Sequence, residues 1–406
     1  MTGRRTHIRI PVAGRYITPL GDEFASVEAL GGIVLVAAAL TALVWANSPS
    51  SDSYTRFWDY ELVIGVGRFA IGESLRQWVN ELLMALFFFV VGLEIKRQLV
   101  EGELNDAQKA RLPVLAALGG MLVPAVVYLT WNLGGHGEKG WGVPMATDLA
   151  FALGVLALLG TRIAPGMKLF LLTLAIVDDI GAIVVIALFY SGGIEPAWLG
   201  GAAVCLLVVA LIRRLGARHP VLYVAPALAL WLCTFESGVH ATIAGVALGL
   251  LTPAGTFRGR RVLDRLEHRL HPWTSFLVVP VFALANAGIA ISSDVLRDAA
   301  SSRITWGVVT GLVVGKVVGI TAATGLGLWL RLGRLPDGVT FRHVLGIGAV
   351  AGIGFTVSLF VADRSFSGAR LGDAKLGILA ASVVAGVLGS GMLLRKARRT
   401  LPAGGS

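Results

Sequence analysis

Asp178 and Asp179 are adjacent in the middle of a long apolar run, MKLFLLTLAIVDDIGAIVVIALFY. A run of about 20 apolar residues is typical of a helix that spans a lipid bilayer. One charged side chain at the bilayer centre costs about 3 kcal/mol on insertion scales, so two carboxylates there point to a function. Asp148 and Lys316 lie in other apolar segments. The pattern favours translocation of ions or protons.

The composition places the chain among membrane proteins. Of its 406 residues, 55% are hydrophobic and 15% are charged, whereas a soluble domain carries about 25% charged residues. The 52 glycines suit close helix packing and interrupted helices. Cys205 and Cys233 both lie in apolar stretches, and no CxxC or HExxH motif occurs. We predict an all-α polytopic membrane protein with no cofactor.

The apolar segments define one transmembrane bundle, 27–398, with about twelve helices. Their predicted limits are 27–46, 79–98, 113–133, 144–160, 167–190, 197–214, 220–235, 237–252, 272–291, 304–331, 341–362 and 374–394. Residues 1–26 and 399–406 are predicted to be a cytoplasmic N-terminal segment and a cytoplasmic tail.

The basic residues predict the orientation of the bundle. With twelve helices, 25 of the 35 Lys and Arg residues fall on the side of the termini and nine on the other, with Lys316 inside the membrane. Cytoplasmic loops carry the excess of Lys and Arg, so both termini are predicted to be cytoplasmic. This asymmetry also accounts for the net charge of +10 without nucleic acid as a partner.

The loop 47–78 is predicted to be extracytoplasmic. Its sequence YELVIGVGRFAIGES has two β-prone runs around a glycine-containing turn, which suits a small β-hairpin. An ordered loop without strands fits equally well. The exposed edges of such a hairpin could pair with a second copy of the chain.

Two triplets of spans, 113–190 and 304–394, have the same organisation in opposite orientation. The middle span of the first contains Pro144, and that of the second contains Gly352 and Gly354. Interrupted spans at matching places in inverted repeats mark the midplane site of many transporters. We therefore predict inverted-topology repeats whose two broken helices cross near the midplane.

The polar residues near these interruptions are the candidate site. Thr147 and Asp148 follow Pro144, so a broken helix would place them beside water, although Asp148 could equally be an ordinary helix N-cap. Neighbouring residues on a helix point about 100° apart. One aspartate of the Asp178–Asp179 pair should therefore face the ion path and the other a partner, for which Lys316 is the natural counter-charge.

A second group of titratable residues lies away from this site. Glu94 falls about one turn inside the end of its span and could line an entry funnel, or be part of an ordinary interfacial helix end. Asp264, Glu267, His268 and His271 occur in a basic loop, where they could titrate near neutral pH or form a solvated face.

Eight stretches in this order resemble the NhaA-type sodium/proton antiporters of bacterial inner membranes. They are VNELLMALFFFVVGLEIKRQL, ATDLAFALGVLALLG, LAIVDDIGAIVVIALFYS, SGVHATIAG, RLEHRLHPW, FALANAG, VGKVVGI and AGIGFTVSLF. The resemblance covers residues from about 30 to 395. Gln98 and Glu81 depart from the family pattern, which has an acid at the first position and aspartate at the second.

The resemblance implies roles for individual residues. Asp179 and Asp148 would bind Na⁺ or Li⁺ and protons, with Thr147 lining the site. Asp178 would pair with Lys316. Glu94, Glu267, His268 and His271 would fall in a region that controls the response to pH, and Gln98 puts the pH profile in doubt.

The resemblance also implies an electrogenic antiporter, often a homodimer in the lipid bilayer, that exchanges external protons for internal Na⁺ or Li⁺ in pH and Na⁺ homeostasis. The residues fit such exchange, because two carboxylates, a hydroxyl and freed carbonyls supply the oxygens that a hard cation prefers. The alternative is a proton-coupled transporter of a small organic solute. An enzyme is not predicted, since no GxGD segment of an intramembrane aspartyl protease is present.

Overall fold

The computed structural model describes residues 19–397, apart from 66–69, 161–162, 217–218, 220 and 258–259. The predicted tail 399–406 and much of the predicted segment 1–26 lie outside the described residues.

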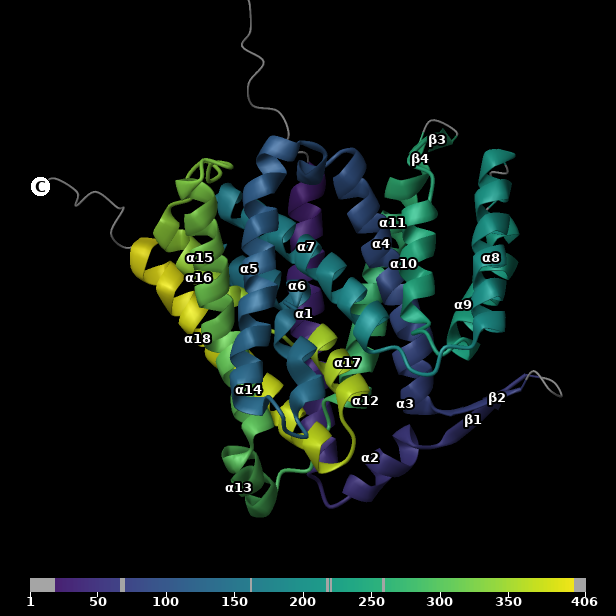
Figure 1. Cartoon of the computed structure of the whole chain (residues 1–406), viewed down its shortest axis with the longest axis horizontal. Coiled ribbons are helices and arrows are strands. Elements are labelled where there is room, and N and C mark those ends of the chain that lie inside the picture. The colour runs from purple at the N-terminus through teal and green to yellow at the C-terminus, as the bar shows by residue number, and fades with distance from the viewer. Residues whose placement is uncertain are drawn as a thin grey trace, which may run out of the picture.

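The described chain is a bundle of apolar helices (Figure 1). Seven are long and apolar enough to cross a membrane, or up to nine if each of two bent pairs is one span. The seven are α3–η2–α4 (Leu75–Trp78, Val79–Leu83 and Met84–Val100), α5 (Ala107–Asn132), η4–α6 (Glu138–Met145 and Leu149–Leu159), α7 (Pro165–Phe189), α8 (Pro196–Arg214), α14–η7–α15 (Arg303–Thr310, Gly311–Gly315 and Lys316–Trp329) and α18 (Ala369–Ala397). Helix α1 (Pro19–Ala46) belongs to one of the two bent pairs.

Shorter elements complete the bundle. These are α9 (Val221–Glu236), α10 (Thr242–Leu251), α11–η6–α12 (Val262–Trp273, Thr274–Val278 and Val279–Asn286), α16 (Phe341–Ala351) and α17 (Thr356–Ser365). The helices α2 (Ser51–Trp58) and α13 (Ser293–Ser301) lie at one end, and η3 (Glu103–Asn105) follows α4. Helix α1 begins before the predicted apolar limit at 27.

Two small hairpins mark opposite ends of the molecule. Strands β1 (Glu61–Ile64) and β2 (Ile71–Ser74) pair antiparallel, with Glu61 opposite Ser74. They project from the bundle at the end that also holds α2 and α13, here called the hairpin end (Figure 1). Strands β3 (Thr256–Phe257) and β4 (Arg260–Arg261) lie at the other end, here called the basic end.

The segment expected to be a basic loop is a helix instead. Asp264, Glu267, His268 and His271 all belong to α11, which continues through η6 into α12. The sequence between 262 and 273 has only a few apolar residues, so an apolar-run criterion begins the helix too late. The helix buries Leu263 and Glu267 on one side, against α4.

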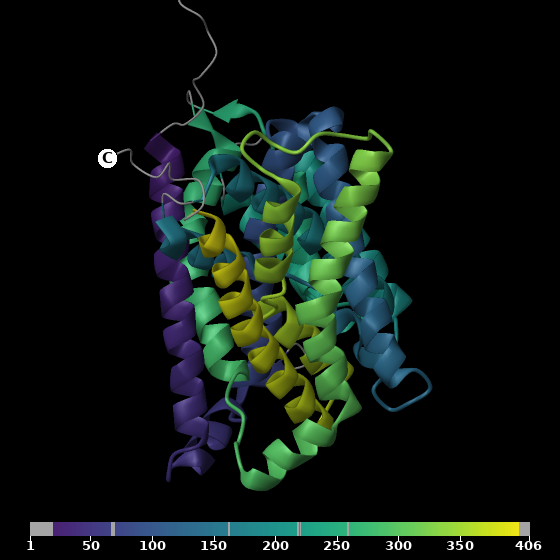
Figure 2. The ribbon, with the colours of Figure 1, turned by 90° about the vertical axis from the view of Figure 1, so that its left-hand side faces the viewer.

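Two helices are interrupted in the middle of the bundle. The chain is extended at Ala146 and Asp148, between η4 and α6. The pair α16 and α17 is bent by 50° at a second break, between Ala351 and Thr356. In Figure 2, the face with α15 and α18 is turned to the viewer, and α16 lies between these two helices.

Glycines let neighbouring helices approach closely. Helices α4 and α10 meet at Gly92, Gly245 and Gly249, and a Cβ built on Gly245 would lie 2.1 Å from the carbonyl oxygen of Ala85. Helices α5 and α15 meet in the same way at Gly119 and Gly319. In a bilayer such contacts are a main source of helix association, because no hydrophobic force drives helices together there.

We expect Gly245→Ala to lower the melting temperature of the detergent-purified protein. The new methyl group would collide with the Ala85 carbonyl oxygen of α4, and overpacking of this kind typically costs about 1–3 kcal/mol. Gly200→Ala is the matched control, because a Cβ added to Gly200 on α8 would have no atom within 4 Å. Equal melting temperatures for the two variants would contradict the tight contact between α4 and α10.

Candidate functional site

The two helix breaks meet each other. The backbone N–H of Asp148, in the first break, donates to the carbonyl oxygen of Ile353 in the second, at 2.7 Å. A side chain at Gly354 would collide with Ser358 Oγ at 2.6 Å and with the Ala146 carbonyl at 3.0 Å. Pro144 lies in the last turn of η4, and Gly352 caps α16. The contact brings the ends of four half-helices to one place.

Asp148 lies at the N-termini of two of them. Its Oδ1 accepts a hydrogen bond from the N–H of Phe151 in α6, at 3.0 Å. Its Oδ2 accepts from both the N–H and the Oγ1 of Thr356 in α17, at 2.9 and 2.8 Å. The N-terminus of a helix favours a negative charge. Asp148 is thus an N-cap, but one buried at the centre of the bundle and shared between two helices.

Lys316 lies at the C-termini of the other two half-helices. Its Nζ donates to the carbonyl oxygen of Met145, the last residue of η4, and to Thr147 Oγ1 at 3.0 Å. Thr147 Oγ1 is in turn 3.0 Å from the carbonyl oxygen of Ala351, which ends α16. A helix C-terminus favours a positive charge. The π-helical turn η7 directly precedes Lys316, and such turns are frequent at functional sites.

Asp178 is the ion-pair partner of Lys316. Its Oδ2 lies 2.5 Å from Lys316 Nζ, and both side chains are fully buried. Thr147 Oγ1 lies 2.6 Å from the same oxygen. The other oxygen, Oδ1, has no hydrogen-bond partner among the described residues. The pair therefore combines full desolvation with incomplete hydrogen bonding.

Asp179 points to a different environment. It makes no hydrogen bond or ion pair with another residue of the described chain. It lines a cavity of about 80 Å³ together with Thr147, Asp148, Glu94 and His271. A water molecule occupies about 30 Å³ of liquid, so the cavity has room for a small ion that has lost most of its hydration water. The 100° offset between the two aspartates thus separates an ion-paired carboxylate from a cavity-lining one.

The charges at the site favour a bound cation or proton. Within the described part of the chain, Asp148, Asp178 and Asp179 face one cation, Lys316, and it is paired with Asp178. Thr147, Asp148 and Asp179 all line the cavity, and their side chains carry oxygen, the ligand type that hard cations prefer. Two carboxylates without a counter-charge are costly in the bilayer interior, which an ion or a proton would relieve.

Glu267 and its neighbours lie above this cavity, towards the basic end. Arg97 Nε on α4 is 3.1 Å from Glu267 Oε2, an ion pair without the alignment of a hydrogen bond. Arg97 also lies 4.0 Å from Glu94. Burial raises the pKa of Glu267 to about 7, against the opposing effect of Arg97. Burial lowers the pKa of His271 to about 4, so His271 stays neutral around pH 7.

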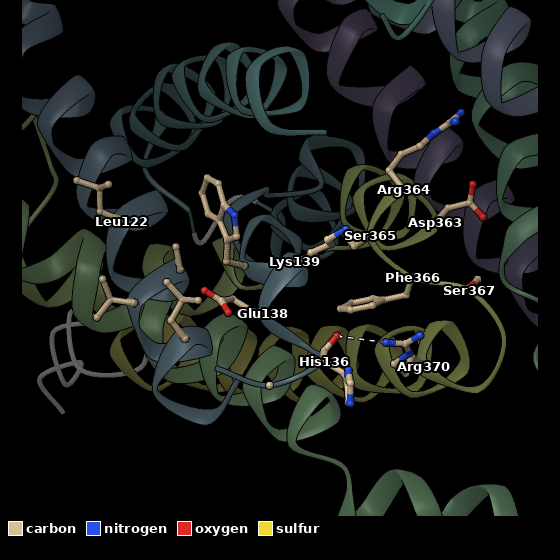
Figure 3. Close-up of a pocket in the computed structure, with 15 residues that line it drawn as sticks. Leu122, His136, Glu138, Lys139, Asp363, Arg364, Ser365, Phe366, Ser367 and Arg370 are labelled. Carbon is tan, nitrogen blue, oxygen red and sulfur yellow. Dashed lines mark hydrogen bonds between the residues drawn. The ribbon is translucent and has the colours of Figure 1, made fainter. Parts of the chain in front are cut away.

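A second, larger cavity lies at the hairpin end. Its volume is about 1220 Å³, and its lining includes Glu138, Lys139, Asp363 and Arg364 (Figure 3). The two cavities share no lining residue. Asp179 therefore communicates with the smaller cavity and not with the larger one.

Thr356 is a site residue that the sequence analysis missed. It binds Asp148 through two hydrogen bonds, although 208 positions separate the two residues. A polar residue that opens an apolar half-helix directly after a glycine-rich break was the available signal. His268, by contrast, is exposed on α11 and does not line the cavity.

Comparisons with known proteins agree on one family. A family model described as Na⁺/H⁺ antiporter 1 matches residues 22–393. The chain is 44% identical to the Na⁺/H⁺ antiporter NhaA of Escherichia coli K12, over 90% of this chain and 96% of that protein. It is 45% identical to Na⁺/H⁺ antiporter NhaA 2 of Myxococcus xanthus, over 95% and 91%, and 44% identical to that of Sorangium cellulosum, over 92% and 89%.

We expect Lys316→Met and Asp178→Asn each to destabilise the protein by about 3–5 kcal/mol, because either change leaves a buried charge without its partner. The double variant should lose clearly less than the sum of the two. Thermal unfolding in detergent measures both. The exposed pair Lys109–Asp106, 4.0 Å apart, is the control, and Lys109→Met should cost less than about 1 kcal/mol. Additive effects at Asp178 and Lys316 would contradict their coupling.

Proposed function

The chain belongs to the NhaA family of Na⁺/H⁺ antiporters, and from this premise we propose that Na⁺ and protons compete for Asp148 and Asp179. The chain is a sodium/proton antiporter and a multi-pass membrane protein. The observation that carries the mechanism is the unpaired Asp179 carboxylate, which shares a cavity with Asp148 while Asp178 is paired with Lys316.

The exchange follows from this geometry. When both carboxylates are ionised, their oxygens and Thr147 Oγ1 form a ligand set for a dehydrated Na⁺ or Li⁺. When they are protonated, their charge is lost and the cation leaves. Alternation of the site between the two sides of the membrane then couples the opposite movements of the two ions. Exchange of unequal numbers of charges makes the transport electrogenic.

The wider architecture is part of the same proposal. It has twelve spans, with 113–190 and 304–394 as inverted repeats and both termini in the cytoplasm of a bacterial inner membrane. The excess of Lys and Arg on the side of the termini supports this orientation. The paired half-helices with opposite ends at Asp148 and Lys316 are what a pair of inverted repeats would produce. The basic end is then the cytoplasmic end.

The hairpin suggests how a homodimer would form. The strands β1 and β2 form a two-stranded sheet whose four β1 residues are all exposed. Such an edge can pair with the same edge of a second copy, and we propose a homodimer in the lipid bilayer on this basis.

The cavity at Asp179 disfavours the organic-solute alternative. Pockets for small organic molecules usually measure about 300–1,000 Å³, whereas this cavity has about 80 Å³ and is lined by several carboxylates. It suits Na⁺, Li⁺ or a proton. The chemistry needed is competition for oxygen atoms, which requires neither an enzyme activity nor a cofactor.

We propose that Glu267 contributes to the pH response. It faces Arg97 and Glu94 on α4, and Asp264, His268 and His271 share its helix. With a pKa of about 7, Glu267 gains its negative charge as the pH rises through neutrality. That charge attracts Arg97 away from Glu94, which lines the Asp179 cavity.

We expect Asp179→Asn to abolish exchange, because the amide cannot bind a proton in competition with Na⁺. Proton movement in vesicles with an imposed pH gradient, after addition of Na⁺ or Li⁺, measures it. Asp294→Asn is the matched control, since Asp294 is exposed on α13, and it should leave exchange unchanged. Exchange above about one tenth of the wild-type rate in Asp179→Asn would remove this residue from the mechanism.

We expect the exchange rate of Glu267→Gln above pH 8 to equal that of the wild type below pH 7, because glutamine mimics the protonated carboxyl. The stability of the variant should also depend less on pH than that of the wild type. Since the folded-state pKa of about 7 exceeds the ordinary 4.5, the wild type loses stability as the pH rises from about 4.5 to 7. Rates of exchange and melting temperatures between pH 5 and 9 measure both effects. Profiles that coincide with the wild type would exclude Glu267 as a sensor.

A further inference from the structure

Helix α17 connects the ion site to the hairpin end. Its first residue, Thr356, holds Asp148. Eight residues later, Arg364 lies at its far end, about 12 Å away at the rise of an α-helix. A single helix of this length moves as a rigid body, so a contact at Arg364 also fixes the position of Thr356.

The far end of α17 is anchored by charged and polar contacts. The Arg364 guanidinium forms an ion pair with Glu81 in η2, and the side chains are 15% and 6% exposed. Next to it, Asn80 Nδ2 donates to Asp363 Oδ2 at 3.1 Å. Asn286 of α12 donates to Asn80 Oδ1 at 2.8 Å. These contacts tie α17 to two other helical elements of the bundle.

The ion pair is incompletely satisfied. Glu81 Oε2 and Arg364 Nε are buried without a hydrogen-bond partner among the described residues. A buried ion pair repays its desolvation only if the remaining polar groups are also bonded. This pair is therefore a poor source of stability and is well suited to break and re-form.

The anchor also lies between the two cavities. Asp363 and Arg364 line the larger cavity at the hairpin end (Figure 3), whereas Thr356 and Val357, at the start of the same helix, line the cavity of Asp179. One helix thus forms a wall of both. A movement of α17 would therefore change the lining of both cavities.

We propose that Glu81 and Arg364 are positioning residues for ion exchange. Their ion pair holds α17 so that Thr356 orients Asp148 towards the Asp179 cavity, and its rupture frees α17 when the site opens to the hairpin end. The proposal rests on the proposed competition of Na⁺ and protons at Asp148 and Asp179.

The test compares Na⁺ affinity with maximal rate in reconstituted vesicles of the full chain. Arg364→Gln and Glu81→Gln should each raise the KM for Na⁺ by about threefold to tenfold, which is at most about 1.4 kcal/mol of binding free energy. The double variant should have the KM of the single variants, since both remove the same interaction. Arg364→Lys keeps the charge and should restore most of the wild-type KM.

Two controls separate positioning from folding and from the parent mechanism. Arg297→Gln makes the same change at an exposed arginine on α13 and should leave the KM unchanged. Stabilisation by Na⁺ in thermal unfolding reports binding without transport. The proposed ion site itself would be refuted if Na⁺ did not raise the melting temperature of the wild type and if the Asp179→Asn variant exchanged ions at the wild-type rate.

The outcomes for the ion pair are then decisive. The proposal is supported if Arg364→Gln and Glu81→Gln raise the KM for Na⁺ by similar factors, if the double variant raises it no further, and if Arg364→Lys restores it. A lowered melting temperature with a KM within twofold of the wild type would show a purely structural role and overturn it. Additive effects of Glu81→Gln and Arg364→Gln would overturn it as well.

Discussion

The convergence of four half-helix ends at one pair of opposite charges is the constraint on which the rest of the structure depends. Asp148 accepts hydrogen bonds from the N-terminal N–H groups of α6 and α17. Lys316 lies at the C-termini of η4 and α16, with Asp178 as its counter-ion. In a bilayer, freed backbone groups must find partners within the protein. The breaks and the charges therefore require each other, because a broken helix without them would leave its backbone unsatisfied.

This arrangement gives the two adjacent aspartates of α7 different environments. Asp178 is committed to Lys316 and Thr147, whereas Asp179, one residue later, turns into the cavity. A structural role would need only the first of these. The second is a buried carboxylate without a partner among the described side chains, and the proposed competition of Na⁺ and protons at Asp179 would account for its cost.

Glycines allow the close packing of the breaks and of the helices around them. A side chain at Gly354 would collide with the Ala146 carbonyl oxygen of the first break, and one at Gly352 with the carbonyl oxygen of Leu312, so glycines at these positions let the two breaks pack closely. The contacts of α4 with α10 and of α5 with α15 hold the surrounding helices at short distance. Between these fixed contacts lies α17, whose two ends meet Asp148 and Glu81.

From the sequence by itself came the helical membrane class, the family, the position of the breaks and the placement of four charged residues inside the bundle, Asp148, Asp178, Asp179 and Lys316. The family followed from the resemblance of eight motifs. The breaks and the charges followed from local chemistry, because a charge or a glycine-rich break in an apolar run is costly and therefore visible. Gln98 was marked as a departure from the family pattern, and in the structure its Oε1 accepts from the N–H of Glu103, a local contact.

Only the tertiary structure decided that Asp148 binds Thr356 and that Glu81 pairs with Arg364. Thr356 and Asp148 are 208 positions apart, and Glu81 and Arg364 are 283 apart. Glu81 and Arg364 each resemble an ordinary charge near the end of a span when taken alone. Pairing over such distances depends on how the helices pack, and the apolar periodicity of single helices carries no information about it. The path from Asp148 along α17 to the hairpin end was therefore visible only in the fold.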